Sequence, residues 1–159
     1  MGNKYKKTNA MRALERAGII YEVQPYTYDP VQLEVRHIAA DNNLPLEQIY
    51  KTLVLKGDKT GPLVALVNGG EDLSLKKVAQ ASNNKKVTLL PIKALQTTTG
   101  YIRGGCSPIG MKKILPTYLD QQAAHLPYLY VNAGVRGLLL RLSPNDLQRV
   151  VPFTYAILA

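Results

Sequence analysis

The stretch YKTLVLKGDKTGPLVALVN, residues 50–68, contains two runs rich in valine and leucine, separated by a short segment that a glycine borders on each side. Runs of this length and composition are typical of β-strands. The segment between Gly57 and Gly61 has the composition of a tight turn. The stretch therefore predicts two central strands, over residues 49–57 and 62–68, joined as a hairpin.

Lys51 places a charge inside the first of these strands. Because side chains alternate between the two faces of a strand, Lys51 shares a face with Leu53 and Leu55, which we expect to point inward. Burying an ammonium group among leucines costs free energy unless the group lines a cavity or meets an anion. Lys51 is therefore a candidate to hold a substrate carbonyl, carboxylate or phosphate. The alternative is an edge lysine whose ammonium group reaches water.

The remaining segments show helical and extended patterns that do not alternate strictly, as they would in a doubly wound sheet. Five helices are expected, near residues 8–18, 35–42, 72–82, 91–96 and 143–151. Five further strands are expected, near residues 19–28, 85–90, 113–120, 128–134 and 137–143. Thr8 and Asp72 are the expected caps of the first and third helices. The sequence thus predicts one α+β domain, residues 1–159, with a mixed and partly barrel-like sheet flanked by helices.

The composition narrows the classes of function. Twenty Lys and Arg residues against eleven Asp and Glu give a net charge of +9, which favours nucleic acid as a partner, although scattered lysines also keep a small protein soluble. We expect no membrane partner and a cytoplasmic location, because no apolar run approaches the roughly 20 residues of a membrane span and the first residues lack the apolar core of a secretory signal. A single Cys106 and the isolated His37 and His125 predict neither a disulfide nor a metal site.

A glycine-rich segment, TTGYIRGGCSPIGMKK, covers residues 98–113. It matches neither the phosphate loop nor the dinucleotide fingerprint, so it predicts no nucleotide cofactor. Its small side chains would let a ligand approach backbone amides, which can stabilise a carbonyl oxygen as it becomes negative. The alternative is a sharp turn between strands. Neither Cys106 nor Ser107 has the sequence surroundings of a catalytic nucleophile.

Five segments, in this order and at this spacing, together resemble the YbaK/EbsC family of Cys-tRNA(Pro) deacylases. They are YTYDP at 26–30, YKTLVLKG at 50–57, DLSLKKVAQASNNKKV at 72–87, TTGYIRGGCSPIGMKK at 98–113 and YVNAGVRGL at 130–138. The resemblance implies a YbaK-like fold and a trans-editing enzyme that cleaves the ester of cysteine mischarged onto tRNA(Pro). It implies aminoacylated tRNA(Pro) and prolyl-tRNA synthetase as partners, and neither a cofactor nor a metal.

The resemblance also assigns site residues. It implies catalytic roles for Lys51 and for Gly104 in the loop 104–110. It implies substrate-binding roles for Tyr26, Val35, Thr52, Gly105, Ser107, Pro108, Gly110 and Asn132. In the mechanism it implies, the thiol of the substrate attacks the ester and leaves as a thiolactone, so that the enzyme only positions and stabilises.

This sequence departs from the family pattern at Asn132, where members often carry serine, and at residues 35–37, where they often carry Phe-Gly-Asp. The departures leave two alternatives to cysteine editing. One is a deacylase for Ala-tRNA(Pro) or another small mischarged aminoacyl-tRNA. The other is a domain that binds tRNA or a synthetase without chemistry.

Overall fold

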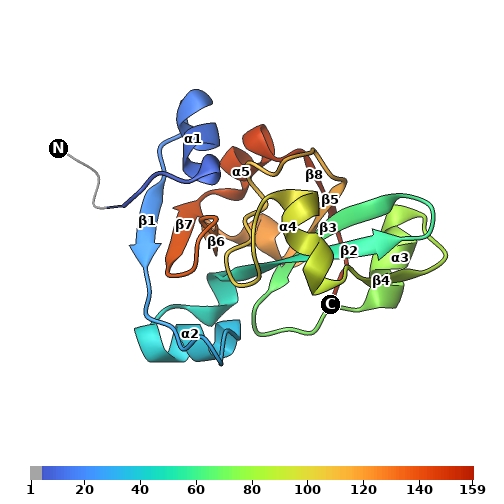
Figure 1. The fold of residues 1–159 in the computed structure, drawn as a ribbon, viewed down its shortest axis with the longest axis horizontal. Helices are drawn as coiled ribbons and strands as arrows, with labels where there is room; N and C mark the ends of the chain where they lie inside the picture. Colours follow the sequence, from blue (N-terminus) through green and yellow to red (C-terminus); the bar gives the residue numbers. More distant parts are fainter. Residues whose placement is uncertain (1–4) are drawn as a thin grey trace.

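A computed structural model describes residues 5–159, in which short helices surround two β-sheets (Figure 1). The helices are α1 (Asn9–Arg16), α2 (Val35–Asn42), α3 (Leu75–Ser82), α4 (Ile92–Thr99) and α5 (Pro144–Val150), with 3-10 turns η1 (Leu46–Gln48) and η2 (Gln121–His125). The strands are β1 (Glu22–Pro25), β2 (Tyr50–Gly57), β3 (Gly61–Asn68), β4 (Val87–Leu89), β5 (Thr117–Asp120), β6 (Leu129–Asn132), β7 (Leu138–Leu142) and β8 (Phe153–Ala156). No helix among the described residues is long and apolar enough to cross a bilayer.

The predicted hairpin is confirmed. Strands β2 and β3 pair antiparallel along their whole length, with Lys51 opposite Val67 and Gly57 opposite Gly61. The turn is held from outside by Asn84, whose side-chain oxygen accepts the amides of Lys59 and Thr60 at 2.8 and 3.0 Å. The hairpin is therefore the longest strand pair, and β4 and β5 add to it on either side.

The strands form two sheets. Five strands lie in the order β4-β2-β3-β5-β8, with β5 parallel to its two neighbours, and three lie in the order β1-β7-β6. One parallel bridge, between Ile49 and Tyr130, joins the two sheets. The mixed α+β fold is as predicted, but the expected barrel-like closure is not formed. Within residues 5–159, β1 and β8 each pair on one side only, because β6 and β7 form a separate sheet with β1.

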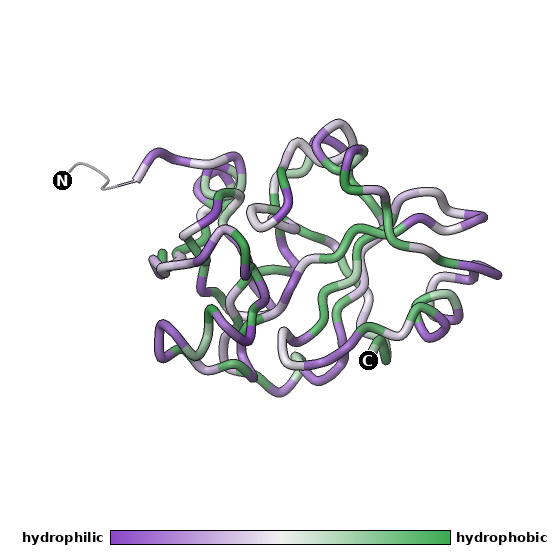
Figure 2. Tube along the Cα trace, turned by 60° about the horizontal axis from the view of Figure 1, so that its bottom comes forward, coloured by the Kyte–Doolittle hydropathy of each residue, from purple (hydrophilic) through white to green (hydrophobic). Residues whose placement is uncertain are grey.

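The main hydrophobic core lies where α1 and α5 cover strands of both sheets. Its centre is fully buried and includes Leu14, Leu66, Leu119, Leu140 and Leu147, each 0% exposed. Figure 2 shows this distribution along the chain, with hydrophobic residues concentrated on the central strands and hydrophilic ones toward the loops. Smaller clusters lie under α3 and under α2, and the second of these supports the site described below.

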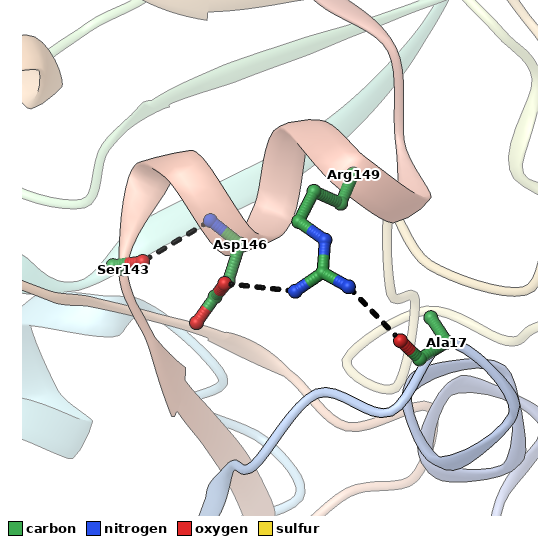
Figure 3. Close-up of polar contacts among 4 residues, drawn as sticks. All are labelled: Ala17, Ser143, Asp146 and Arg149. Carbon is green, nitrogen blue, oxygen red and sulfur yellow. Dashed lines mark hydrogen bonds and ion pairs between the residues drawn. The ribbon is translucent and has the colours of Figure 1, made fainter.

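Side-chain caps define where the helices begin. Thr8 caps α1 as predicted, accepting the amide of Met11 at 3.2 Å. At α5, the Ser143 hydroxyl accepts the amide of Asp146 at 3.1 Å, and Arg149 donates to the carbonyl of Ala17 at 3.1 Å, which ties α5 to the end of α1 (Figure 3). The predicted cap at Asp72 is wrong, because α3 begins only at Leu75 and Ser74 caps it. Strand β8, after α5, was not predicted.

Candidate active site

A cavity of about 670 Å³ lies between α2, the start of β2 and the glycine-rich loop. This volume suits a small organic ligand. The lining residues are Tyr26, Leu33, Glu34, Val35, Arg36, Ile38, Tyr50, Lys51, Thr52, Leu53, Gly69, Asp72, Arg103, Gly104, Cys106 and Asn132. The cavity therefore combines an aliphatic and aromatic wall with several charged groups.

Lys51 lines the cavity near the start of β2. Strand β2 pairs with β3 along its whole length but with β4 only at residues 55–57, so at Lys51 the backbone is paired on the β3 side alone, opposite Val67. Tyr50 and Val54 belong to the main core, and Tyr50 and Leu53 also line the cavity with Lys51. No hydrogen bond or ion pair within residues 5–159 uses its ammonium group. The charge is thus available to a ligand in the cavity.

Thr52, the next residue, has an unsatisfied hydroxyl. Its Oγ1 is the one buried side-chain polar atom among the described residues that has no hydrogen-bond partner. Leaving such a group unpaired costs about 1–3 kcal/mol, so native proteins rarely do so without a reason. Thr52 lines the cavity, but Oγ1 itself has no exposed surface, so a ligand would meet this hydroxyl only after the side chain rotates.

Gly104 forms part of the cavity wall, and as a glycine it contributes only backbone atoms. Its φ of +81° lies in the left-handed region that favours glycine, and an added Cβ would lie 2.9 Å from Nε of Arg136 and 3.1 Å from Cδ1 of Leu33. Its carbonyl accepts the side-chain amide of Asn132 at 2.9 Å. No hydrogen bond among residues 5–159 uses its own N–H. The loop is therefore anchored by its carbonyl while its amide remains unpaired.

Asn132, at the end of β6, links two parts of the cavity wall to the turn that begins at Gly134. Besides the Gly104 carbonyl, its Nδ2 lies 3.4 Å from the hydroxyl of Tyr26, and its Oδ1 accepts the amide of Gly134 at 2.7 Å. Burial raises the pKa of the Tyr26 hydroxyl, which keeps it neutral. Every hydrogen-bonding atom of the Asn132 amide group is in use. This residue acts as a brace for the loop.

Six of the ten site residues expected from sequence line this cavity, and the structure does not bring the other four into it. The six are Tyr26, Val35, Lys51, Thr52, Gly104 and Asn132. Gly105 packs instead against the backbone of Val135 and Arg136, and Ser107 is 0% exposed with its hydroxyl accepting the amide of Ile109. Pro108 and Gly110 border a separate cavity of about 170 Å³ beside Ala13 of α1. The chain turns into the core after Cys106, so the second half of the loop faces away from the site.

Four charged residues at the cavity were not predicted: Glu34, Arg36, Asp72 and Arg103. Arg36 of α2 donates to the carbonyl of Gly70. Arg103 has its carbonyl held by Nε of Arg136 at 2.9 Å. Arg103 lies inside the glycine-rich segment, so its position beside Gly104 was a usable signal. The contact between Arg36 and Gly70 joins distant parts of the chain and left no signal in the sequence.

The cavity is poorly suited to nucleophilic or metal chemistry by its own residues. Burial raises the pKa of the Cys106 thiol to about 11, so the thiolate that would attack a substrate is scarce at neutral pH. Neither histidine lines the cavity. Among the described residues, no three His, Cys, Asp or Glu side chains gather closely enough to hold a metal ion. The arrangement can bind an ester, orient it and stabilise negative charge on its carbonyl oxygen.

Comparisons with known proteins agree with this chemistry. The family model described as the aminoacyl-tRNA editing domain matches residues 30–150. The chain is 47% identical over 140 residues to EbsC of Enterococcus faecalis, named as a candidate Cys-tRNA(Pro)/Cys-tRNA(Cys) deacylase, covering 88% of this chain and 85% of that relative.

The fold is also similar to those of solved structures. A candidate trans-editing enzyme for prolyl-tRNA synthetase is similar with a TM-score of 0.82 and 26% identity, covering 94% of each chain. The hypothetical protein APE2540 is similar in fold, with a TM-score of 0.83 at 18% identity over 95% of this chain and 99% of that one.

Proposed function

The chain belongs to the aminoacyl-tRNA editing domain family, and on that premise we propose that it is a deacylase that cleaves the ester of cysteine mischarged onto tRNA(Pro). One observation supports this proposal most directly. Lys51, Thr52 and Gly104 all line one cavity, and within residues 5–159 the ammonium group of the first, the hydroxyl of the second and the backbone amide of the third have no hydrogen-bond partner. These are the kinds of group that bind and polarise an aminoacyl ester.

Each group has a proposed task. The amide of Gly104 would donate to the ester carbonyl oxygen as it becomes negative, and Lys51 would add a positive charge beside it. Thr52 would donate to or accept from a polar group of the bound aminoacyl-adenosine. Asn132 holds Gly104 and does not need to touch the reacting atoms. We expect most of the catalysis to come from orientation and charge stabilisation.

The proposed reaction uses the thiol of the substrate cysteine as the nucleophile. Its sulfur bonds to the ester carbonyl carbon, the bond from that carbon to the ribose oxygen breaks, and the thiol proton passes to that oxygen. Uncharged tRNA and cysteine thiolactone are released, and water then opens the thiolactone. This route is consistent with a cavity whose own thiol, Cys106, has its pKa raised to about 11.

The proposed partners follow from this role. Mischarged tRNA(Pro) is released by prolyl-tRNA synthetase, so a transient encounter with that enzyme would deliver the substrate, and the protein would work beside the translation machinery of the cytoplasm. The relative EbsC has a name that includes both Cys-tRNA(Pro) and Cys-tRNA(Cys). Discrimination between tRNA bodies is thus a separate question from discrimination between amino acids.

The test is single-turnover deacylation of Cys-tRNA(Pro), Ala-tRNA(Pro) and Pro-tRNA(Pro), with the products of the first reaction separated and identified. We expect rapid loss of cysteine with thiolactone as the first product, and intact Pro-tRNA(Pro). If alanine is released as fast as cysteine, the thiol cannot be the nucleophile and the substrate assignment is wrong. If no ester is cleaved, the protein is a binding domain.

A further inference from the structure

We propose that a second, strongly basic groove on the other side of the 134–137 turn binds the acceptor end of the tRNA, immediately before the aminoacylated nucleotide. This inference rests on the proposed function. The groove has a volume of about 500 Å³ and lies between the segment that leads into α1, α1 itself and the start of β7. It shares no lining residue with the cavity around Lys51, so it is a distinct site.

All the charged residues that line this groove are basic. Lys6, Lys7, Arg12 and Arg136 line it, and none of its lining residues is acidic. Lys7 is paired with Glu15 at 2.6 Å. Among residues 5–159 the other three have no carboxylate partner, since Arg12 donates to the side chain of Asn9 and Arg136 to a backbone carbonyl. The cavity around Lys51 differs, because Glu34 and Asp72 lie among its basic groups.

The groove and the cavity share a wall. Arg136 lines the groove, while its Nε holds the carbonyl of Arg103 and lies against Gly104. Gly134 also lines the groove, and its amide donates to Asn132 on the cavity side at 2.7 Å. A chain of phosphates in the groove would therefore pass Arg136 and reach the cavity at Gly104. This is the path that the last nucleotides of an aminoacyl-tRNA need.

Charge and continuity together identify the occupant as a nucleic-acid strand. Each phosphate of the strand brings one negative charge, and each basic side chain that neutralises a phosphate releases a bound counterion. A strand whose last nucleotide lies in the cavity has its preceding phosphates outside it, where Arg136 and Arg12 are available. Exposed Lys6 extends the basic surface further from the cavity.

A matched control lies elsewhere on the molecule. Lys76, Lys85 and Lys86 line another shallow groove, of about 350 Å³, beside α3 and β4. In Figure 1, α3 and α1 lie at opposite ends of the molecule, so this groove is far from the basic groove beside α1. Replacing two of these lysines with glutamate changes the net charge as much as replacing Lys6 and Arg12.

The experiment compares Lys6→Glu/Arg12→Glu with Lys76→Glu/Lys85→Glu. For each, kcat/KM is measured with Cys-tRNA(Pro) and with the cysteine ester of adenosine, which has no phosphates, at low and at physiological salt. We expect the first variant to lose about tenfold or more with tRNA, with a shallower salt dependence, and nothing with the adenosine ester. The control should match the wild type on both substrates. Thermal melting of both variants checks that these exposed substitutions leave the fold intact.

Two results would overturn the inference. One is an equal loss with tRNA in both variants, since only overall charge would then matter. The other is an equal loss with tRNA and with the adenosine ester in the first variant, since the cavity itself would then be damaged. If the wild type cleaves neither ester, the proposed function fails, and affinity for tRNA, measured with the same variants, still tests the groove.

Discussion

Residues 103–106 and residues 107–110 are neighbouring halves of one glycine-rich loop, yet they face different parts of the molecule. The first half borders the cavity through Arg103, Gly104 and Cys106. The second half is buried against α1, with Ser107 and Ile109 both 0% exposed. Glycine, serine and proline in a sequence thus mark a chain that turns tightly, without showing which side of the turn meets a ligand.

Each half contains a glycine whose substitution would test how that half contributes to activity or stability. Gly104 and Gly110 both have a positive φ, +81° and +75°. Around Gly104, a Cβ would meet the flexible side chain of Arg136, whereas at Gly110 it would lie 2.9 Å from the backbone of Asn9. A side chain can move aside more easily than backbone. We therefore expect a substitution in the first half to cost activity and one in the second half to cost stability.

The largest effect on the fold is expected from Gly110→Ala. A left-handed alanine costs about 1–2 kcal/mol, and overpacking against the backbone adds about 1–3 kcal/mol, so the free energy of unfolding should fall by about 2–5 kcal/mol. Urea unfolding of both proteins measures this. Deacylation per folded molecule should stay near that of the wild type. An unchanged midpoint, or a folded but inactive variant, would show that the two halves do not differ as described.

Gly104→Ala is the converse test. The same backbone strain applies, but Arg136 can shift, so we expect about 1–2 kcal/mol of destabilisation. The rate of deacylation should fall by about tenfold to a hundredfold, because a displaced amide no longer meets the carbonyl oxygen. Single-turnover rates and urea midpoints are measured on the same preparations. A variant with full activity would remove Gly104 from the proposed chemistry.

A smaller loss is expected from Asn132→Ala, because this side chain acts through Gly104. Removing the hydrogen bond at 2.9 Å should weaken the loop by about 1 kcal/mol and slow deacylation by about fivefold. The double variant with Gly104→Ala should be little slower than Gly104→Ala alone, since both changes release the same loop. Strictly multiplicative losses would mean that Asn132 contacts the substrate independently.

The smallest effect is expected from Cys106→Ala. Because burial raises the pKa of this thiol to about 11, the group remains protonated up to pH 9 and contributes no ionisation to the activity profile there. Rates measured between pH 6 and 9 should agree with the wild type within about twofold. A lost inflection in that range, or an inactive variant, would make Cys106 a participant in the reaction.

Local patterns in the sequence were enough to predict most of the elements. The hairpin around Gly57 and Gly61, helix α2 and the Thr8 cap all depend on neighbouring residues, and the structure confirms them. Strand β8 was missed, because its four residues follow α5 directly and pair only with β5. The partly barrel-like closure that was expected is absent for a related reason, since the pairing of β1 with β7 joins segments that are distant in the chain.

The site was predictable to the extent that its residues lie on regular structure. The charge of Lys51 inside an apolar strand drew attention to this residue, and it lines the cavity, although its neighbours from both faces of β2, Tyr50 and Thr52 among them, do so too. The inward turn after Cys106 depends on contacts with Asn9 and Tyr101, which no local pattern contains. The link from Arg36 to Gly70 and the brace from Asn132 to Gly104 likewise join segments that are distant in the chain.

The most direct test of the central claim is single-turnover deacylation of Cys-tRNA(Pro) by the wild type, Lys51→Ala and Lys56→Ala. Lys56 is an exposed lysine on the same strand that does not line the cavity. We predict that Lys51→Ala melts at the wild-type temperature, still binds tRNA and is slower by about a hundredfold or more, while Lys56→Ala is unaffected. Equal rates for all three proteins would contradict the assignment of this cavity as the site of ester cleavage.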